Sequence, residues 1–224
     1  MSGAKTLDQL WNQVNILNKR HFSSNNLAPI IGNGKTSSPD IMFVFINPTA
    51  RNISSDPGWK GPRFPFIGTK QVWRIFHRAG LFDDGLMEYM ENNPHWSLDF
   101  TGKVLRFLKR KSFYITNIVK WTGEDATLPN SEKIKLFLPI LLREIELVRP
   151  RHIVTFGLIP FENLTGQKIK LSEYYAGVKK SGKLKTYDLV IDSTRSKVIP
   201  CYFPVGRGDP KKAVEILKML CALE

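Results

Sequence analysis

The sequence predicts an α/β protein, a single-domain three-layer α/β/α sandwich built on a central, mostly parallel sheet. Short apolar runs that lack polar alternation recur along the chain, and segments with helical periodicity separate them, as expected for strands covered on both faces. Hydrophobic residues make up 42% of the 224 residues, which is ample material for a core. One domain is expected over residues 1–224, with 1–38 forming an N-terminal helix and loop extension.

The first half of the chain supplies two helices and two strands. A helix is expected at residues 6–20, where apolar residues recur at helical spacing, and the run "DIMFVFI" at 40–46 predicts a buried strand. The segment "TKQVWRIFHRAGL" at 69–81 predicts a helix that ends near Gly80. The run "SFYITNIV" at 112–119 predicts a second buried strand.

The second half continues the alternation. A helix is expected at 131–148, with Ser131 as its N-cap and with Pro139 either bending it or marking a change of segment. A strand at 151–157, a short helix at 159–166 and two strands at 183–192 and 197–204 follow. The last helix begins with Asp209 as N-cap and Pro210 in the first turn.

The charge of the chain points to a polyanionic partner. With 33 Lys and Arg against 20 Asp and Glu, the formal net charge is +13. This excess favours nucleic acid over a membrane, because no basic amphipathic helix or lipidation signal stands out. Simple solubility is the alternative explanation of the charge.

No apolar run approaches the length of a membrane span, and residues 1–30 lack the apolar core of a signal peptide, so an intracellular protein is expected. Cys201 and Cys221 are the two cysteines, and neither they nor the four histidines show metal-ligand spacing. We therefore expect packing cysteines, no disulfide, and neither a metal nor an organic cofactor.

The stretch "INPTARNISSDPGWKGPRFPFIG" at 46–68 is the first candidate for a site. An Asn-Pro turn follows a buried strand, and a Gly/Pro-rich loop then leads to a second, aromatic turn. In α/β proteins, sites commonly form at the carboxyl edge of the sheet from such turns. The alternative is a surface connection whose phenylalanines cover the core.

Several segments, in the right order, resemble the uracil-DNA glycosylase superfamily over most of residues 39–220. "FINPT" is similar to the Gly-Ile-Asn-Pro-Gly motif of the mismatch-specific uracil and thymine-DNA glycosylases, and "FPFIGTKQVWRIFHRAGL" to the aromatic turn and helix that follow it. "FYITNIVKW" and "RPRHIVTFGLIPFENLTG" resemble segments of the thermophilic, iron-sulfur branch. "CYFPVGRGDP" occupies the place of the second motif.

The resemblance implies a catalytic role for Asn47, whose amide would orient a water molecule toward the sugar carbon of an extruded nucleotide. Phe66 matches the aromatic residue that stacks on the base, and Ile46 matches a position in the base pocket. The alternatives are an ordinary turn asparagine before proline and a core phenylalanine.

Asn117 matches the asparagine that reads the Watson-Crick edge of the base. An amide suits uracil because its NH₂ donates to O4 while its carbonyl accepts from N3-H. Lys120 follows three residues later and is interpreted as facing phosphate or leaving group, or else as a solvated lysine. For Asn117 the alternative is a cap at a strand end.

Departures from the family pattern modify what the resemblance implies. Phe203 stands where many members have a catalytic His, a feature shared with the mismatch-specific and thymine-DNA branches and expected to slow turnover. Thr49 replaces a Gly of the first motif, and Val205 stands where the second often has Ser. Two cysteines cannot supply the four ligands of an iron-sulfur cluster, so no cluster is expected.

The second-motif loop is expected to contact DNA through Pro204, Val205 and Gly206, with Thr49 beside it. Arg207 falls at the position of the wedge that fills the space left by the extruded base, or else contacts phosphate.

The sequence thus predicts a monomeric, monofunctional DNA glycosylase that removes uracil, and by extension mispaired thymine or deaminated purines, from DNA. A non-catalytic nucleic-acid or base-binding protein on the same scaffold is the alternative. An unrelated nucleotide-binding enzyme is disfavoured, since "IGNGK" is not followed by the helix that a phosphate-binding loop requires.

Overall fold

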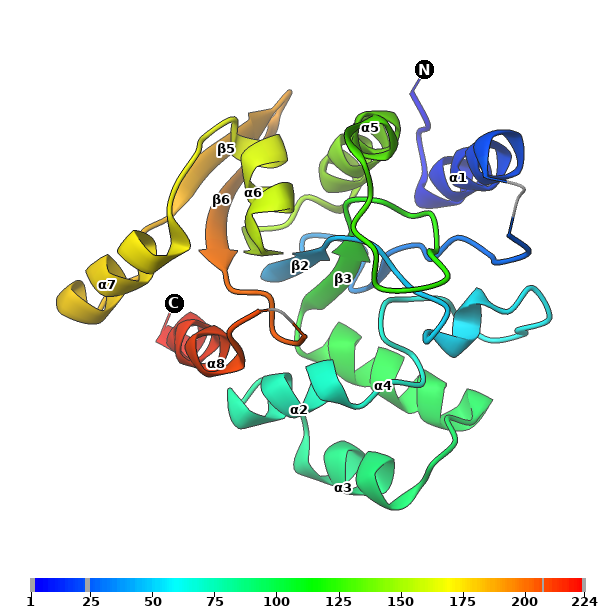
Figure 1. The fold of residues 1–224 in the computed structure, drawn as a ribbon, viewed down its shortest axis with the longest axis horizontal. Helices are drawn as coiled ribbons and strands as arrows, with labels where there is room; N and C mark the ends of the chain where they lie inside the picture. The colour runs from blue at the N-terminus through cyan, green and yellow to red at the C-terminus, as the bar shows by residue number, and fades with distance from the viewer. Residues whose placement is uncertain (1–2, 23–24, 207, 223–224) are drawn as a thin grey trace.

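The centre of the protein is a six-stranded, mostly parallel sheet with the strand order β1-β3-β2-β4-β6-β5. A computed structural model describes residues 3–22, 25–206 and 208–222, shown in Figure 1. The neighbouring strands β3, β2, β4 and β6 run parallel, while the short edge strand β1 and the edge strand β5 are antiparallel to their neighbours. The strands are β1 (Asn33–Gly34), β2 (Ile41–Phe45), β3 (Phe113–Asn117), β4 (His152–Phe156), β5 (Tyr187–Ile191) and β6 (Thr194–Cys201).

The burial of the strands follows their position in the sheet. All residues of β2 and β3 are buried, whereas in the edge strand β5 buried and exposed residues alternate. Central parallel strands are covered on both faces, so they carry continuous apolar runs rather than a period of two. The predicted α/β class and mostly parallel sheet are confirmed.

Helices cover both faces of the sheet, as Figure 1 shows. One layer contains α1 (Leu7–His21), α5 (Ser131–Val148) and α6 (Leu158–Thr165), and the other contains α2 (Gln71–Arg78), α4 (Leu98–Arg110) and α8 (Pro210–Lys218). α3 (Asp84–Asn92) packs outside α2, and α7 (Leu171–Ser181) lies beyond the β5 side of the sheet. Short 3₁₀ turns span Ile53–Ser55 and Met219–Ala222.

Several helix ends differ in detail from the expectation. The side chain of Asn130, rather than Ser131, caps α5 by accepting from the Lys133 N–H, and the helix continues through Pro139 without a change of segment. Asp209 caps α8 as predicted. The helices α3, α4 and α7 were not predicted.

The N-terminal segment contributes to the main fold. α1 packs against α5, and β1 pairs with β3, so the described part of residues 1–38 adds to both the helical layer and the sheet. Among the described residues, no helix is long and apolar enough to cross a membrane.

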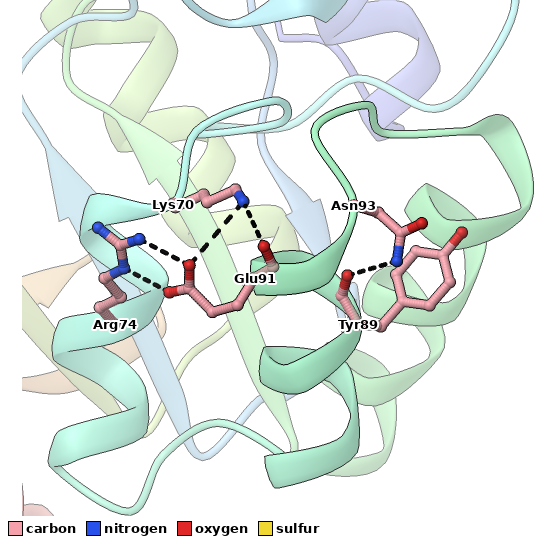
Figure 2. Close-up of polar contacts among 5 residues, drawn as sticks. All are labelled: Lys70, Arg74, Tyr89, Glu91 and Asn93. Atoms are coloured by element: carbon pink, nitrogen blue, oxygen red, sulfur yellow. Dashed lines mark hydrogen bonds and ion pairs between the residues drawn. The ribbon is translucent and has the colours of Figure 1, made fainter.

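An ionic contact joins α3 to α2 just after the aromatic turn at Phe66 (Figure 2). Arg74 donates two hydrogen bonds to the Glu91 carboxylate at 2.5 and 2.6 Å, and the Lys70 ammonium donates to the Glu91 carbonyl at 3.1 Å. Asn93 closes the end of α3 by donating to the Tyr89 carbonyl at 2.8 Å. Such partly exposed pairs add little stability.

Candidate functional site

The ends of β2 and β3 form the centre of the site. Phe45 and Asn117 are the last residues of these strands and lie directly opposite each other in the parallel register. Residues in register point to the same face of the sheet, which here is the face of α2, since the ring of Phe43 contacts Phe76 of that helix. Asn117 therefore lies beside the aromatic ring of Phe45.

Asn117 is a buried amide without a partner. Its side chain is fully buried, and neither Nδ2 nor Oδ1 has a hydrogen-bond partner among the residues that the structure describes. Leaving a buried polar group unpaired costs about 1–3 kcal/mol, so such groups call for a functional or structural explanation. A donor and an acceptor at one strand end suit a ligand that offers the complementary pair.

Asn47 lies two residues beyond Phe45 and is partly exposed. Its Nδ2 donates a long bond of 3.3 Å to the carbonyl of Pro48, and no bond to its Oδ1 occurs within the described ranges. The turn itself is held in place, because Gly123 donates to the Pro48 carbonyl at 3.0 Å and Ala50 donates to the Gly123 carbonyl at 2.8 Å. These bonds fasten the loop after β2 to the loop after β3.

Phe66 is held against Phe45 in a strained backbone conformation. Its φ of 69° lies in the left-handed region, which costs energy for an aromatic residue and is common at functional sites. Its carbonyl accepts from Trp73 Nε1 at 3.0 Å and from Thr69 Oγ1 at 3.1 Å. The half-buried ring meets the ring of Phe45 edge to face, with 4.5 Å between the centroids.

A third aromatic side chain joins Phe45 and Phe66, and the three rings form what we call the aromatic wall: Phe45, Phe66 and Phe203. Phe203, from the loop after β6, approaches Phe45 edge to face at 6.3 Å, while Phe156 of β4 stacks on Phe45 at 4.2 Å. Phe66 and Phe203 are both half-buried, so each residue retains some exposed surface. An aromatic wall beside an unpaired amide is chemically suited to a flat, polar ring.

The loop that carries Phe66 is held together by the side chain of Asn52, which no sequence pattern marks as functional. Asn52 is buried, donates to the Phe64 carbonyl at 2.8 Å, and accepts from both the backbone and the hydroxyl of Ser54 at 3.0 and 2.8 Å. An Asn in "ARNISSDP" is a common turn residue, so its pattern alone did not distinguish this role.

Lys120 differs from both expectations for it. Its side chain is fully buried on the opposite face of the sheet from Asn117, and its ammonium pairs with Glu144 of α5 at 2.5 Å. It also donates to Thr116 Oγ1 at 2.5 Å and to the Asn117 carbonyl at 2.6 Å. Lys120 is therefore neither solvated nor open to phosphate. It holds the backbone of Asn117.

The Glu144 carboxylate is the hub of this buried network. Its Oε1 accepts from the Tyr114 hydroxyl and from Thr116 Oγ1, both at 2.9 Å. Burial lowers the pKa of Lys120, although Glu144 opposes this effect, and burial together with Glu144 raises the pKa of Tyr114 well above its usual range. Glu144 stands between Arg143 and Glu146 in α5, so its sequence context did not distinguish it as the centre of this cluster.

The remaining predicted contacts have different environments. Ile46 is buried, its carbonyl accepts from Val119, and its side chain lies near Gly157 at the start of α6. Thr49 forms an isolated parallel β-bridge with Gly123. These placements bring Ile46 and Thr49 to the same sheet edge as Asn47.

The second-motif loop is close to the aromatic wall. Pro204 is buried, Val205 is half-buried and Gly206 is exposed with a φ of 61°. Gly206 thus presents backbone to solvent, whereas the Pro204 ring packs inward and is not available for a direct contact. The predicted wedge, Arg207, lies outside the described residues.

The donor set does not fit an iron-sulfur cluster. The sequence contains two cysteines, and Cys201 is fully buried on β6, where burial raises the pKa of its thiol. Within the described part of the chain, no three His, Cys, Asp or Glu side chains gather in a way that could hold a metal ion.

Comparison with known proteins gives two matches. The model of the Uracil DNA glycosylase superfamily matches residues 31–221 of this chain. A curated protein from Pyrobaculum aerophilum, called type-4 uracil-DNA glycosylase, is 32% identical over 72 residues, which is 32% of this chain and 37% of that protein. The aligned part thus spans little more than a third of the relative, and its name gives no support to the predicted similarity with the mismatch-specific branch.

Proposed function

Because the chain belongs to the uracil DNA glycosylase superfamily, we propose that it is a monofunctional DNA glycosylase that hydrolyses the N-glycosidic bond of uracil in DNA. The observation that carries this proposal is the unpaired, buried amide of Asn117 beside the aromatic wall of Phe45, Phe66 and Phe203. We expect the protein to act as a monomer, and mispaired thymine and deaminated purines are further substrates to test.

In the proposed reaction, the extruded base stacks on Phe66 and meets the amide of Asn117. Stacking contributes about 1–3 kcal/mol per base, which offsets much of the few kcal/mol that extrusion costs. The amide NH₂ donates to O4 of uracil and its carbonyl accepts from N3-H. Cytosine reverses both bonds, so the pocket rejects it.

Asn47 then positions the attacking water. The water oxygen forms a bond to C1′ while the C1′–N1 bond breaks, and its electron pair leaves with the base as the N1 anion. The water proton passes to solvent, and the products are the free base and an abasic sugar. A neutral amide is a poor base, so Asn47 contributes orientation rather than proton abstraction.

The second candidate is a protein that binds extruded bases without cleaving them. It is favoured by Phe203, because an apolar ring in the second-motif loop cannot donate a hydrogen bond to the leaving anion. Both candidates predict binding, and only the first predicts abasic sites.

Single-turnover excision separates the two. Labelled oligonucleotides containing uracil, thymine opposite guanine, hypoxanthine or xanthine are incubated with the protein, and abasic sites are cleaved with alkali. We expect excision of uracil, reduced by at least about a hundredfold in Asn47→Ala with DNA binding retained. Asn163→Ala is the matched control, since this exposed α6 asparagine only donates within its helix. No abasic sites with any substrate would favour the binding protein.

The identity of the base is tested through Asn117→Asp, which replaces the amide donor by an acceptor. Uracil excision should weaken relative to cytosine excision, because a buried polar group loses its match. An unchanged ratio of uracil to cytosine excision would make Asn117 a structural residue and not the base reader.

A further inference from the structure

A groove lined by lysines lies beside α7. It has a volume of about 470 Å³ and runs between α7 and the segment at 183–187. Its floor is formed by the buried side chains of Tyr174, Val178 and Tyr187. Four lysines and one carboxylate line it: Lys168, Lys170, Lys183, Lys185 and Glu173.

The charge of this lysine groove is largely uncompensated. Glu173 pairs with Lys170 at 3.0 Å, and no ion pair to Lys168, Lys183 or Lys185 occurs among the described residues. Three like charges around one concave surface raise the local positive potential and favour an anionic occupant. Lysine ammonium groups bind phosphate as point charges, without the fixed geometry of arginine.

Helix α7, which forms one side of the groove, packs against the loop after β6 that carries Phe203. On the side of α7 that faces the loop after β6, Tyr175 packs edge to face on Tyr202 at 6.1 Å and donates to Glu215 of α8 at 2.6 Å. On the groove side, Tyr174 donates to the Lys185 carbonyl at 2.9 Å. These contacts hold α7, and with it the groove, in a fixed position relative to the loop that carries Phe203.

The strand order sets the distance between the groove and the base reader. From β3, which carries Asn117, the sheet continues through β2, β4 and β6 to β5, which begins at Tyr187 in the groove floor. Four steps of about 4.8 Å give roughly 19 Å across the sheet. Tyr187, which contacts Phe161 on the α6 face, lies in register with Tyr114, three residues before Asn117, so about 10 Å along the strands brings the separation to roughly 22 Å. Along duplex DNA, with 3.4 Å between phosphates of one strand, this corresponds to about six base pairs.

We propose that the lysine groove binds the phosphate backbone of DNA about six base pairs from the extruded base. The inference rests on the proposed function for the identity of the polyanion, while the groove and its charge are independent of the chemistry at Asn47. Its role is to hold the flanking duplex in register, because phosphate contacts position a protein on DNA without reading sequence.

The test compares two variants that each remove three positive charges. The groove variant is Lys168→Gln, Lys183→Gln and Lys185→Gln, which leaves the pair of Lys170 with Glu173 intact. The control variant is Lys109→Gln, Arg110→Gln and Lys111→Gln, at the exposed end of α4 where the chain enters β3 from the amino edge of the sheet. Affinity for a 24-base-pair duplex is measured by fluorescence anisotropy between 50 and 200 mM salt.

Each lost phosphate contact lowers the slope of log affinity against log salt by about 0.9, which corresponds to about an eightfold loss at 0.1 M salt. We therefore expect the groove variant to lose up to about 500-fold in affinity and about 2.7 in slope. The control should lose far less. Equal losses in the two variants would overturn the proposal, because they would show that only net charge matters.

Duplex length gives a second, positional test. With a central abasic site, one flank is shortened from twelve to four base pairs, first on one side and then on the other. Shortening one flank should abolish the difference between wild type and groove variant, while shortening the other should preserve it. A difference that survives both truncations would overturn the assigned position.

The outcomes also separate this inference from the proposed function. Loss of affinity in the groove variant would support the groove even if the wild type excised no base. Unchanged affinity in the groove variant, with excision by the wild type, would reject the groove alone. Unchanged DNA affinity combined with lost binding to phosphatidylserine vesicles would reject the proposal in favour of a membrane surface.

Discussion

Replacing Lys120 by methionine removes the cation of the buried network while keeping a side chain of similar length. In the wild type, the ammonium has three acceptors, which are Glu144 Oε2, Thr116 Oγ1 and the Asn117 carbonyl. In the variant, the Glu144 carboxylate keeps only the neutral hydroxyls of Tyr114 and Thr116 as donors. The Asn117 carbonyl loses its partner as well.

The expected cost follows from the burial of both charges. Lys120 and Glu144 have 0% exposed side chains, and removing one partner of such a pair typically costs about 3–5 kcal/mol. For a chain of this size, about 2–4 °C of melting temperature is lost per kcal/mol, so a decrease of roughly 6–20 °C is expected. The double variant Lys120→Met with Glu144→Gln should recover much of this loss, since no uncompensated charge remains.

Urea unfolding measures these stabilities, with Lys109→Met as the exposed control, which should change stability by less than about 0.5 kcal/mol. Single-turnover excision at 20 °C below the lowest melting temperature then tests whether the network positions Asn117. We expect slower uracil excision in Lys120→Met than in the control. A loss of stability below about 1 kcal/mol would refute the reasoning from the buried pair.

Two further predictions concern the pH dependence of stability and the second-motif loop. Burial, and to a lesser extent the charge of Arg151, lowers the pKa of His152 in the folded protein from its usual 6.5. As the pH falls, the unfolded chain therefore binds the proton first, and the wild type should lose more stability between pH 8 and pH 5 than His152→Gln. Urea unfolding at both pH values measures this difference, and equal losses would show that His152 is not responsible. A Cβ on Gly208 would overlap with the carbonyl oxygen of Phe203, so Gly208→Ala should cost about 1–3 kcal/mol of stability and slow excision. Gly177 in α7 has open space around it, so the control Gly177→Ala should be neutral or stabilising in the same unfolding assay. A neutral Gly208→Ala would mean that the loop moves freely.

The sequence was most informative where strands are buried on both faces. The runs around Phe45 and Asn117 predicted β2 and β3, and their ends predicted the sheet edge at which the two asparagines lie. The missed α4 had a readable signal, because Phe100, Val104 and Phe107 recur at helical spacing after the N-cap Ser97. α7 buries only two residues, so its amphipathic signal is weak.

Side-chain direction beyond a strand end was not predictable from spacing. Asn117 and Lys120 are three residues apart, and Lys120 was expected either to face phosphate or leaving group or to be solvated. The strand ends at Asn117, and the chain then bonds to the Phe45 and Ile46 carbonyls through Ile118 and Val119, which places Lys120 under α5 instead. Only the path of the backbone determines which face each side chain reaches.

The two faces of this strand end have complementary roles in the proposed enzyme. On the α5 face, the ammonium of Lys120 satisfies the Asn117 carbonyl within a fully buried ion pair, which fixes the backbone. On the α2 face, the amide of the same residue is left unpaired beside the aromatic wall. Since Phe203 offers no hydrogen bond to the departing base, the proposed catalysis must depend on the orientation of the base and of the water at Asn47. Orientation of this kind requires rigid supports, and a buried network behind the base reader provides one.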